Sequence, residues 1–300
     1  MLDFLPAWLK GTLSLLLIIA NTVIIFIPLM LIALIKLIIP IEQIRNPLSK
    51  LLILIANQWV RMNAWNFKLF NRINWELTGL NELQRDEWCL VISNHQSWVD
   101  IFVLQTNLLS RVPYIKFFLK KELIWVPLMG LAWWALDFPF MKRYSKAFLK
   151  KNPHLKGQDL EITRKACEKF KNSPIAIMNF VEGTRFTSQK HTKQDSPFDH
   201  LLKPKAGGIA FVLSVMGNYF DSIVNVTIAY PNGIPTFWDF LCGRASHIKM
   251  SVEKMAVTPE ILGDYDNDQE FKKSFQEWVN SLWKQKDKQI GFMLDTVKKN

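Results

Sequence analysis

Cysteine and histidine are scarce in this 300-residue chain, and their scarcity excludes several kinds of site. The three cysteines, Cys89, Cys167 and Cys242, are far apart and form no Cys-x-x-Cys pair, which predicts free thiols in a reducing compartment. The five histidines show no paired ligand spacing, so no metal site is predicted. No internal repeat, long linker or recognisable nucleic-acid-binding module is present, and we expect no nucleic-acid partner.

Charge is missing from the stretch between Gly11 and Ile35, and the apolar character resumes after Lys36 up to Pro40. A run of about 20 apolar residues is long enough to cross the hydrocarbon core of a bilayer. No small-x-small cleavage site follows this run, so a removable signal peptide is not expected. Asn21 and Pro28 leave a second arrangement open, in which two short helical arms dip into one leaflet and return.

Basic residues then outnumber acidic ones, with Lys36, Arg45 and Lys50 against Glu42. By the positive-inside rule this excess places the rest of the chain on the cytoplasmic side of a cytoplasmic (inner) membrane. The net charge of +11 favours anionic partners. Because a membrane segment is present, membrane lipids and phosphate-bearing substrates are the simplest expectation.

Beyond residue 70, short apolar runs alternate with segments of helical periodicity. This order predicts an α/β sandwich, with a central mixed sheet flanked by helices and preceded by N-terminal membrane helices. We divide the chain into membrane-anchoring helices at 1–70, a central domain at 71–255, and a C-terminal amphipathic helix with a basic tail at 256–300. The expected strands lie near 73–80, 88–92, 114–119, 138–141, 175–181, 223–229 and 248–252. The expected helices lie near 48–70, 123–136, 144–150, 157–172, 205–217 and 268–285, with one more that follows the first polar turn and ends near 109. The very apolar helix at 123–136 is expected to pack inward.

A polar cluster follows the strand at 88–92 and contains His95 and Asp100. Histidine exchanges protons near neutral pH, and a carboxylate bonded to one ring nitrogen leaves the other free to act as a base. On one straight helix the two residues would lie about 140° apart. They meet only if His95 lies in the turn after the strand and Asp100 in the first turn of the next helix. Taken alone, these residues fit equally well a strand-turn-helix corner with a buried, satisfied histidine.

A second polar cluster, Glu182-Gly183-Thr184-Arg185, follows the strand at 175–181. Glycine permits a tight turn, and the planar guanidinium of arginine suits a phosphate or carboxylate. Ligands bind at the ends of strands in open α/β sheets. The alternative for this cluster alone is a surface Glu-Arg pair in a loop.

Together the two clusters resemble the 1-acylglycerol-3-phosphate acyltransferases, a family of glycerolipid acyltransferases. Its Asn-His-x4-Asp block is matched by Asn94, His95 and Asp100, and its Glu-Gly-Thr-Arg block by residues 182–185. Residues 140–143 are similar to its Phe-Ile-x-Arg block, although Asp137 stands in place of the usual leading glycine. Its strand closed by proline is similar to residues 224–231. The segments 120–130 and 202–208 are similar to the family's connecting segments, and they are more typical of its lysocardiolipin-acyltransferase-like branch. The resemblance covers roughly residues 75–235.

The resemblance implies transfer of a fatty acyl group from a thioester to the free hydroxyl of lysophosphatidic acid, giving phosphatidic acid. In that reaction His95 is the general base and Asp100 orients it. Substrate binding falls to the Glu-Gly-Thr-Arg block (Glu182, Gly183, Thr184 and Arg185), with Arg143 and Lys121 as further candidates. Arg185 and Arg143 would hold the acceptor phosphate, and Glu182 would bind the acceptor or fix Arg185. No metal or bound organic cofactor is implied, because acyl-CoA or acyl carrier protein serves as cosubstrate.

Three alternatives stay open at this stage. The acceptor is another lysophospholipid, such as lysophosphatidylglycerol or lysocardiolipin; the His-Asp pair activates water in a thioester hydrolase; or the protein only binds membrane lipid. The helix at 123–136 would, in the acyltransferase interpretation, also suit the wall of an acyl-chain tunnel. We expect the polar segment 187–200 to lack regular structure and the basic tail at 284–299 to be solvated.

Overall fold

The computed structural model describes residues 4–141, 164, 167 and 174–295. Arg143 and the helices predicted at 144–150 and 157–172 lie outside these described residues, except for Arg164 and Cys167. The three cysteines are all buried and free, as the sequence predicts.

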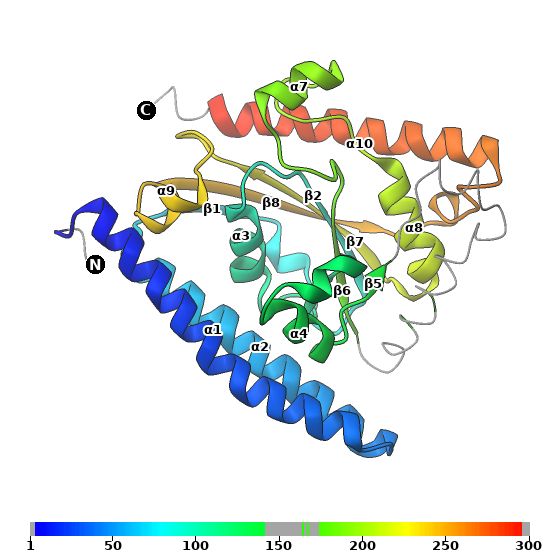
Figure 1. Cartoon of the computed structure of the whole chain (residues 1–300). Helices are drawn as coiled ribbons and strands as arrows, with labels where there is room; N and C mark the ends of the chain where they lie inside the picture. Colours follow the sequence, from blue (N-terminus) through cyan, green and yellow to red (C-terminus); the bar gives the residue numbers. More distant parts are fainter. Residues whose placement is uncertain (1–3, 142–163, 165–166, 168–173, 296–300) are drawn as a thin grey trace.

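A six-stranded mixed sheet forms the centre of the molecule, in the order β1-β8-β7-β2-β6-β3 (Figure 1). The strands are β1 (Asn74–Thr78), β2 (Cys89–Ser93), β3 (Ile115–Phe117), β6 (Ala176–Phe180), β7 (Ser222–Ala229) and β8 (His247–Ala256). Only the β7–β8 pair is antiparallel. Every residue of β2 and β7 is buried, because helices cover both faces of the sheet. The predicted sandwich with a mixed sheet is confirmed.

Two helices cover one face of the sheet, α8 (Ala206–Met216) and α10 (Gln269–Asp295), and α3 (Val99–Leu108) and α9 (Phe237–Leu241) lie on the other (Figure 1). Successive side chains of a β-strand point to opposite faces of the sheet, and they therefore belong to two separate hydrophobic cores. Leu90 of β2 joins the α8–α10 side, whereas Val91 joins the α3–α9 side. Short 3-10 turns complete the connections: η1 (Leu80–Glu82), η5 (Gly217–Tyr219) and η6 (Pro259–Ile261).

Helix α10 extends ten residues beyond the end predicted at 285, and the expectation of a solvated basic tail is wrong for Lys286. This side chain is buried, and its Nζ donates to the Val226 carbonyl at 2.6 Å and to Thr227 Oγ1 at 3.0 Å. Burial lowers the pKa of Lys286 to about 7. The polar sequence concealed this contact because its acceptors belong to β7. Helix α10 therefore belongs to the same core as the sheet.

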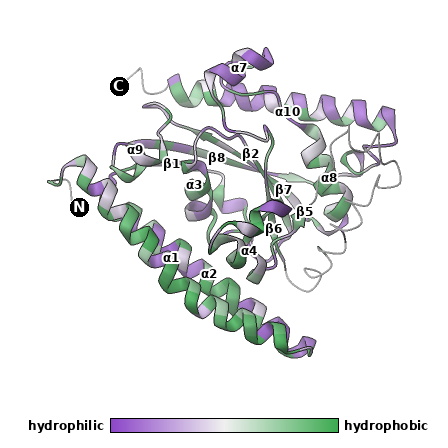
Figure 2. Ribbon diagram, in the orientation of Figure 1, coloured by the Kyte–Doolittle hydropathy of each residue, from purple (hydrophilic) through white to green (hydrophobic). Residues whose placement is uncertain are grey.

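The N-terminal segment forms a helical hairpin of α1 (Ala7–Ile38) and α2 (Glu42–Phe70), which lie side by side (Figure 1). Helix α1 runs unbroken through Asn21 and Pro28, so two short arms within 11–40 are not formed. It is long and apolar enough to cross a membrane, and Figure 2 shows that most of its residues are hydrophobic. Asn21 Nδ2 joins the two helices by donating to the Trp59 carbonyl at 3.0 Å and to Asn63 Oδ1 at 2.9 Å. Helix α2 begins before Pro47, earlier than predicted.

The hairpin packs along the α/β domain near both ends of α1. Near its start, Gly11 lies against α9 so closely that a Cβ there would be 2.6 Å from Cys242 Sγ. Near its end, α1 packs on α4 (Met129–Ala135), and Lys36 forms an ion pair with Asp137. Asp137 adopts φ +56°, the left-handed conformation that glycine favours. The turn is therefore formed although aspartate stands where the family usually has glycine.

The predicted strand at 114–119 is divided between β3 and β4 (Leu119–Lys120), and β4 pairs with β5 (Phe140–Met141) in a separate two-stranded sheet. The single helix predicted at 123–136 is likewise two elements, η2 (Lys121–Trp125) and α4. Pro127 and the positive φ of Leu128, +59°, separate them.

Candidate active site

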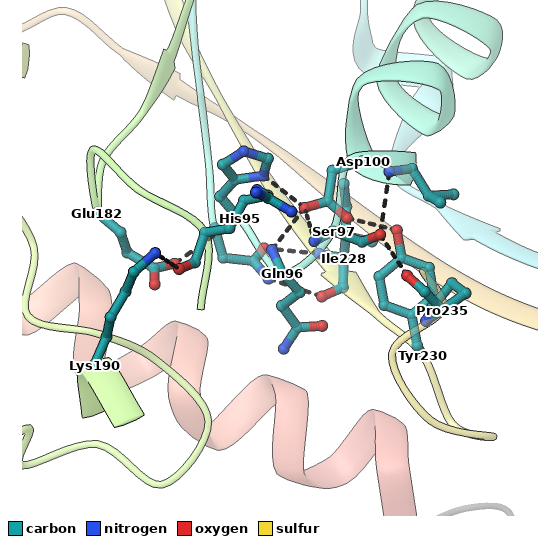
Figure 3. Close-up of polar contacts among 12 residues, drawn as sticks. His95, Gln96, Ser97, Asp100, Glu182, Lys190, Ile228, Tyr230 and Pro235 are labelled. Atoms are coloured by element: carbon teal, nitrogen blue, oxygen red, sulfur yellow. Dashed lines mark hydrogen bonds and ion pairs between the residues drawn. The ribbon is translucent and has the colours of Figure 1, made fainter. Parts of the chain in front are cut away.

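His95 and Asp100 meet at the carboxyl end of β2, in the geometry that the sequence predicts. Strand β2 ends at Ser93, His95 lies in the following turn, and Asp100 lies in the first turn of α3. His95 Nδ1 is 2.8 Å from Asp100 Oδ2 (Figure 3). The carboxylate therefore fixes the ring so that its other nitrogen, Nε2, faces away from Asp100.

Asp100 is fully buried and is surrounded by hydrogen-bond donors. Besides His95, its Oδ2 accepts from the backbone N–H groups of Gln96 at 2.6 Å and Ser97 at 2.9 Å. Its Oδ1 accepts from the Tyr230 hydroxyl at 2.5 Å (Figure 3). Donors on both oxygens stabilise a buried negative charge.

Tyr230 is a site residue that sequence reasoning missed, since it follows β7 and is 130 positions from Asp100. Burial, followed by the charge and hydrogen bond of Asp100, raises the pKa of Tyr230 well above its usual value. The phenol is therefore kept as a hydrogen donor. The only signal in the sequence was a tyrosine at the end of a strand that proves to neighbour β2.

The His95 ring stacks on Phe180 at the end of β6, with centroids 3.9 Å apart and planes inclined by 14°. No hydrogen bond joins Nε2 to any residue in the described part of the chain. Stacking, the bond to Asp100 and the backbone contacts hold the ring in one orientation. The nitrogen that would act on a substrate is thus left unbonded.

Asn94 acts as an extension of the sheet. Its side-chain Nδ2 donates to the Ile228 carbonyl and its Oδ1 accepts from the Ile228 N–H, both at 2.9 Å. The backbone ladder between β2 and β7 stops at Ser93 and Val226, so the amide continues the pairing by one step. This contact fixes the start of the turn that carries His95.

Glu182 is buried inside the domain, where its carboxylate is bonded to backbone groups. Its carboxylate is fully buried, and it accepts from the His95 N–H and from the Leu202 N–H, each at 3.0 Å. Burial raises the pKa of Glu182 to about 7, against the opposing effect of these two donors. Each carboxylate oxygen accepts one backbone N–H, which gives Glu182 a structural role in the turn; direct binding of the acceptor or of Arg185 stays a prediction. Glu182 connects the two sequence clusters.

The Gly183–Arg185 turn borders the His95 cluster directly. Gly183 has φ +66°, and the Phe186 N–H donates to the His95 carbonyl at 2.7 Å. Segment 187–200, expected to be irregular, contains α7 (Ser188–Gln194), which the Thr187 side chain caps by accepting from the Lys190 N–H. A short surface helix has no apolar stripe, so periodicity could not find it.

Several cations surround this turn. Lys190 Nζ donates to Thr184 Oγ1 at 2.7 Å and to the Arg185 carbonyl at 3.0 Å. The Lys205 side chain lies beside Gly183, where an added Cβ would be 3.2 Å from its Nζ. The Arg185 guanidinium lies 4.6 Å above the centre of the Trp98 ring, which brings it to the His95 turn. The turn is therefore suited to an anion.

The remaining predicted residues do not join this cluster in the described structure. Lys121 is exposed at the start of η2, and no hydrogen bond among the described residues links it to His95, Asp100 or Glu182. The Ser97 side chain, which the sequence did not assign to the site, donates from Oγ to the Pro235 carbonyl at 2.6 Å, while its backbone N–H bonds Asp100. No group of three metal-ligating side chains occurs in the part of the chain that the structure describes.

A histidine with a buried carboxylate, beside a cation-lined turn, is an arrangement suited to deprotonating a substrate's own nucleophile next to an anion. Residues 74–230 match the Acyltransferase family over just over half of the chain, and the chain belongs to that family. This match confirms the resemblance seen in the motifs.

Named relatives point to the same group. The chain is 24% identical over 215 residues to the human 1-acyl-sn-glycerol-3-phosphate acyltransferase delta, covering 67% of this chain and 52% of the relative. It is 24% identical over 226 residues to the zebrafish (Danio rerio) lysocardiolipin acyltransferase 1, covering 70% and 54%. The chain thus spans about half the length of the curated relatives it matches.

The fold is similar to that of the crystal structure of the 1-acyl-sn-glycerophosphate acyltransferase PlsC from Thermotoga maritima. The TM-score is 0.50 with 17% sequence identity, and the similarity covers 90% of this chain and 94% of the other. At this identity the comparison establishes the fold alone.

Proposed function

We propose that this protein transfers a fatty acyl group from an acyl thioester to the free hydroxyl of a lysophospholipid, with lysophosphatidic acid as acceptor and phosphatidic acid as product. The observation that carries the proposal is the 2.8 Å contact between His95 Nδ1 and Asp100, which leaves Nε2 unbonded to described residues. The names of the human and zebrafish relatives support a lysophospholipid acceptor.

In the proposed reaction, His95 Nε2 takes the proton from the acceptor hydroxyl as that oxygen attacks the thioester carbonyl. The resulting imidazolium is stabilised by Asp100 through Nδ1. Collapse of the tetrahedral intermediate breaks the carbon–sulfur bond, and His95 returns its proton to the leaving thiolate. No protein side chain is acylated, because the acceptor supplies the nucleophile; Ser97 is bonded to the Pro235 carbonyl instead.

The acceptor phosphate is proposed to bind at the Gly183–Arg185 turn. Arg185 supplies the planar guanidinium, and Lys205 adds a second cation beside Gly183. Arg143 is a further candidate by resemblance, whereas the exposed Lys121 is a weaker one. Glu182 has a positioning role in this proposal, because it fixes the His95 backbone.

The donor is proposed to be acyl-CoA or acyl carrier protein, and no metal or bound organic cofactor takes part. Helix α1 is proposed to attach the protein to the cytoplasmic membrane, with the catalytic domain on the cytoplasmic face. The length and apolar composition of α1 support attachment. The basic excess after the apolar run supports the orientation.

A transfer assay with the purified full chain tests the proposal. Labelled acyl-CoA or acyl carrier protein is offered with lysophosphatidic acid, lysophosphatidylglycerol or lysocardiolipin, and the products are separated. Labelled phosphatidic acid as the main product is the expected result. A preference for lysocardiolipin would show that the acceptor is lysocardiolipin, the lipid in the name of the zebrafish relative. Free fatty acid released without acceptor would indicate a thioester hydrolase, and no chemistry with any donor or acceptor would indicate a lipid-binding protein.

A further inference from the structure

We propose that the α/β domain makes its own contact with the lipid bilayer, through an apolar surface on η2 and α4 centred on Trp125. This η2–α4 patch consists of Trp125, Val126, Leu128, Leu131 and Trp134. The inference rests on the proposed attachment of α1 to a membrane, and it adds a second contact that places the catalytic domain against the lipid surface.

The patch exposes large apolar side chains that a soluble surface would not keep together. Trp125 is 86% exposed, Leu131 47%, Leu128 40%, and Val126 and Trp134 37% each. The sequence predicted that this stretch packs inward, and that prediction is wrong for all five residues. Concentrated apolar exposure within ten positions marks an interaction surface.

The patch adjoins the apolar surface of α1. Helices α1 and α4 share one core cluster, in which Leu29 and Ala33 lie with Ala135 and Leu136. Next to the buried Lys36, α1 exposes Leu37, and it exposes Leu31, Leu34 and Ile35 on the side that faces away from α4. The η2–α4 patch therefore lies beside the helix that the proposed attachment places in lipid, and Figure 2 shows α4 next to the hairpin.

The way in which α1 packs also places this patch at the membrane. The domain contacts α1 at Gly11 through α9 and at Lys36 through Asp137. These positions are separated by about 37 Å of helix, which exceeds the roughly 30 Å hydrocarbon thickness of a bilayer. A domain that packs along α1 over that length stays on the cytoplasmic face only if α1 lies along the membrane surface, and the domain then rests on the same lipid surface as α1. The elements flanking the helix must meet lipid.

The chemistry of the patch suits the boundary between headgroups and acyl chains. Tryptophan gathers at that boundary because its ring is apolar and its N–H is polar. Lys120, immediately before η2, and Lys121, its first residue, are exposed and would face anionic headgroups. We therefore identify the partner as the surface of an anionic bilayer, with Trp125 at the level of the headgroups.

Site-specific fluorescence on the full chain tests this proposal. The three native cysteines are buried, so a thiol-reactive bimane reports on a single introduced cysteine, with the wild-type protein as labelling control. The test position is Trp125→Cys. The positive control is Ile24→Cys, on the exposed face of α1, where the side chain is 65% exposed. The negative control is Phe292→Cys, where the side chain is 75% exposed, on helix α10, which lies across the sheet from the hairpin (Figure 1).

The probes are mixed with phosphatidylglycerol–phosphatidylethanolamine vesicles, and quenching by doxyl-labelled lipid and by aqueous iodide is measured. At Trp125→Cys we expect doxyl quenching and an iodide quenching constant at least threefold lower with vesicles than without. The same result is expected at Ile24→Cys and no change at Phe292→Cys. In a binding assay, Trp125→Ser with Leu131→Ser should weaken vesicle partitioning about tenfold, whereas Phe292→Ser should leave it unchanged.

The controls separate the possible failures. Lipid quenching at Ile24→Cys but not at Trp125→Cys would overturn the second contact while leaving the attachment of α1 intact. No lipid quenching at either position would overturn the proposed attachment together with this inference. Loss of iodide access at Trp125→Cys without vesicles, growing with protein concentration, would show that a second copy of the chain covers the patch.

Discussion

Tyr230 donates its phenolic hydrogen to Asp100 at 2.5 Å, and thereby joins the end of β7 to the residue that orients His95. The two residues are 130 positions apart in the chain, but their strands β7 and β2 are neighbours in the sheet. Asp100 thus receives donors from its own turn and from a second strand. The carboxylate has little freedom to move away from His95.

Replacing Tyr230 with Phe removes this donor and leaves the ring. A hydrogen bond to a charged group contributes about 1.5–3 kcal/mol, and part of that amount supports the orientation of Asp100. We expect kcat to fall about 5–30-fold, with the KM values of acceptor and donor unchanged. Steady-state kinetics with both substrates checks this expectation, and an unchanged kcat would show that the three backbone and ring donors suffice.

The buried carboxylate of Glu182 gives a second prediction. In Glu182→Gln the amide presents a donor to one of the two backbone N–H groups, at His95 or Leu202, that the carboxylate accepted. A buried donor without an acceptor costs about 1–3 kcal/mol, so kcat should fall about tenfold or more. The KM for the acceptor should stay within about twofold, because Glu182 is buried. A rise in KM alone would instead support direct binding of the acceptor.

The same residue predicts a pH dependence of stability. Burial raises the pKa of Glu182 from 4.5 to about 7, so between these values the folded protein holds a proton that the unfolded chain releases. Stability contributed by this group is present below pH 4.5 and is lost as the pH rises through 7. The Tm difference, wild type minus Glu182→Gln, should therefore decrease from pH 5 to pH 8 in detergent. A difference that is constant or increases with pH would be inconsistent with this burial.

The sequence predicted the His95–Asp100 contact because both residues are local to one strand-turn-helix corner. It predicted the inner strands because β2, β6 and β7 are short apolar runs. It did not predict Tyr230 or the backbone partners of Glu182, since these depend on which strands become neighbours. The burial of Lys286 was missed for a related reason: its acceptors are on β7, and a lysine in a basic helix gives no local sign of them.

The contact between Trp98 and Arg185 predicts an effect on acceptor affinity. Cation–π pairs contribute about 0.5–2 kcal/mol, so Trp98→Ala should raise the acceptor KM about 2–30-fold with little change in kcat. Trp98→Phe keeps an aromatic face and should retain most of the affinity. In an Arg185→Ala background, Trp98→Ala should have no further effect on KM. A lower KM in Trp98→Ala would show that the ring holds Arg185 away from the acceptor.

The ion pair between Lys36 and Asp137 predicts a coupling between α1 and the turn at residue 137. Asp137→Gly keeps the left-handed backbone and leaves the buried ammonium of Lys36 without this carboxylate. We expect this variant to lose about 1–3 kcal/mol of stability, the cost of leaving a largely buried donor without its acceptor. Adding Lys36→Met should restore much of the loss. Thermal unfolding of the two single variants and the double variant in detergent measures the coupling, and strictly additive effects would show that the pair is not coupled.

The measurement that tests the account most directly is the single-turnover rate of acyl transfer from labelled acyl-CoA to lysophosphatidic acid, for wild type, His95→Ala and Asp100→Asn. Loss of the base should reduce the rate by at least a thousandfold, and Asp100→Asn, which disturbs the tautomer, by at least a hundredfold. Binding to vesicles and the Tm of His95→Ala should stay close to wild type. A His95→Ala rate within a few-fold of wild type would contradict the assignment of His95 as the base.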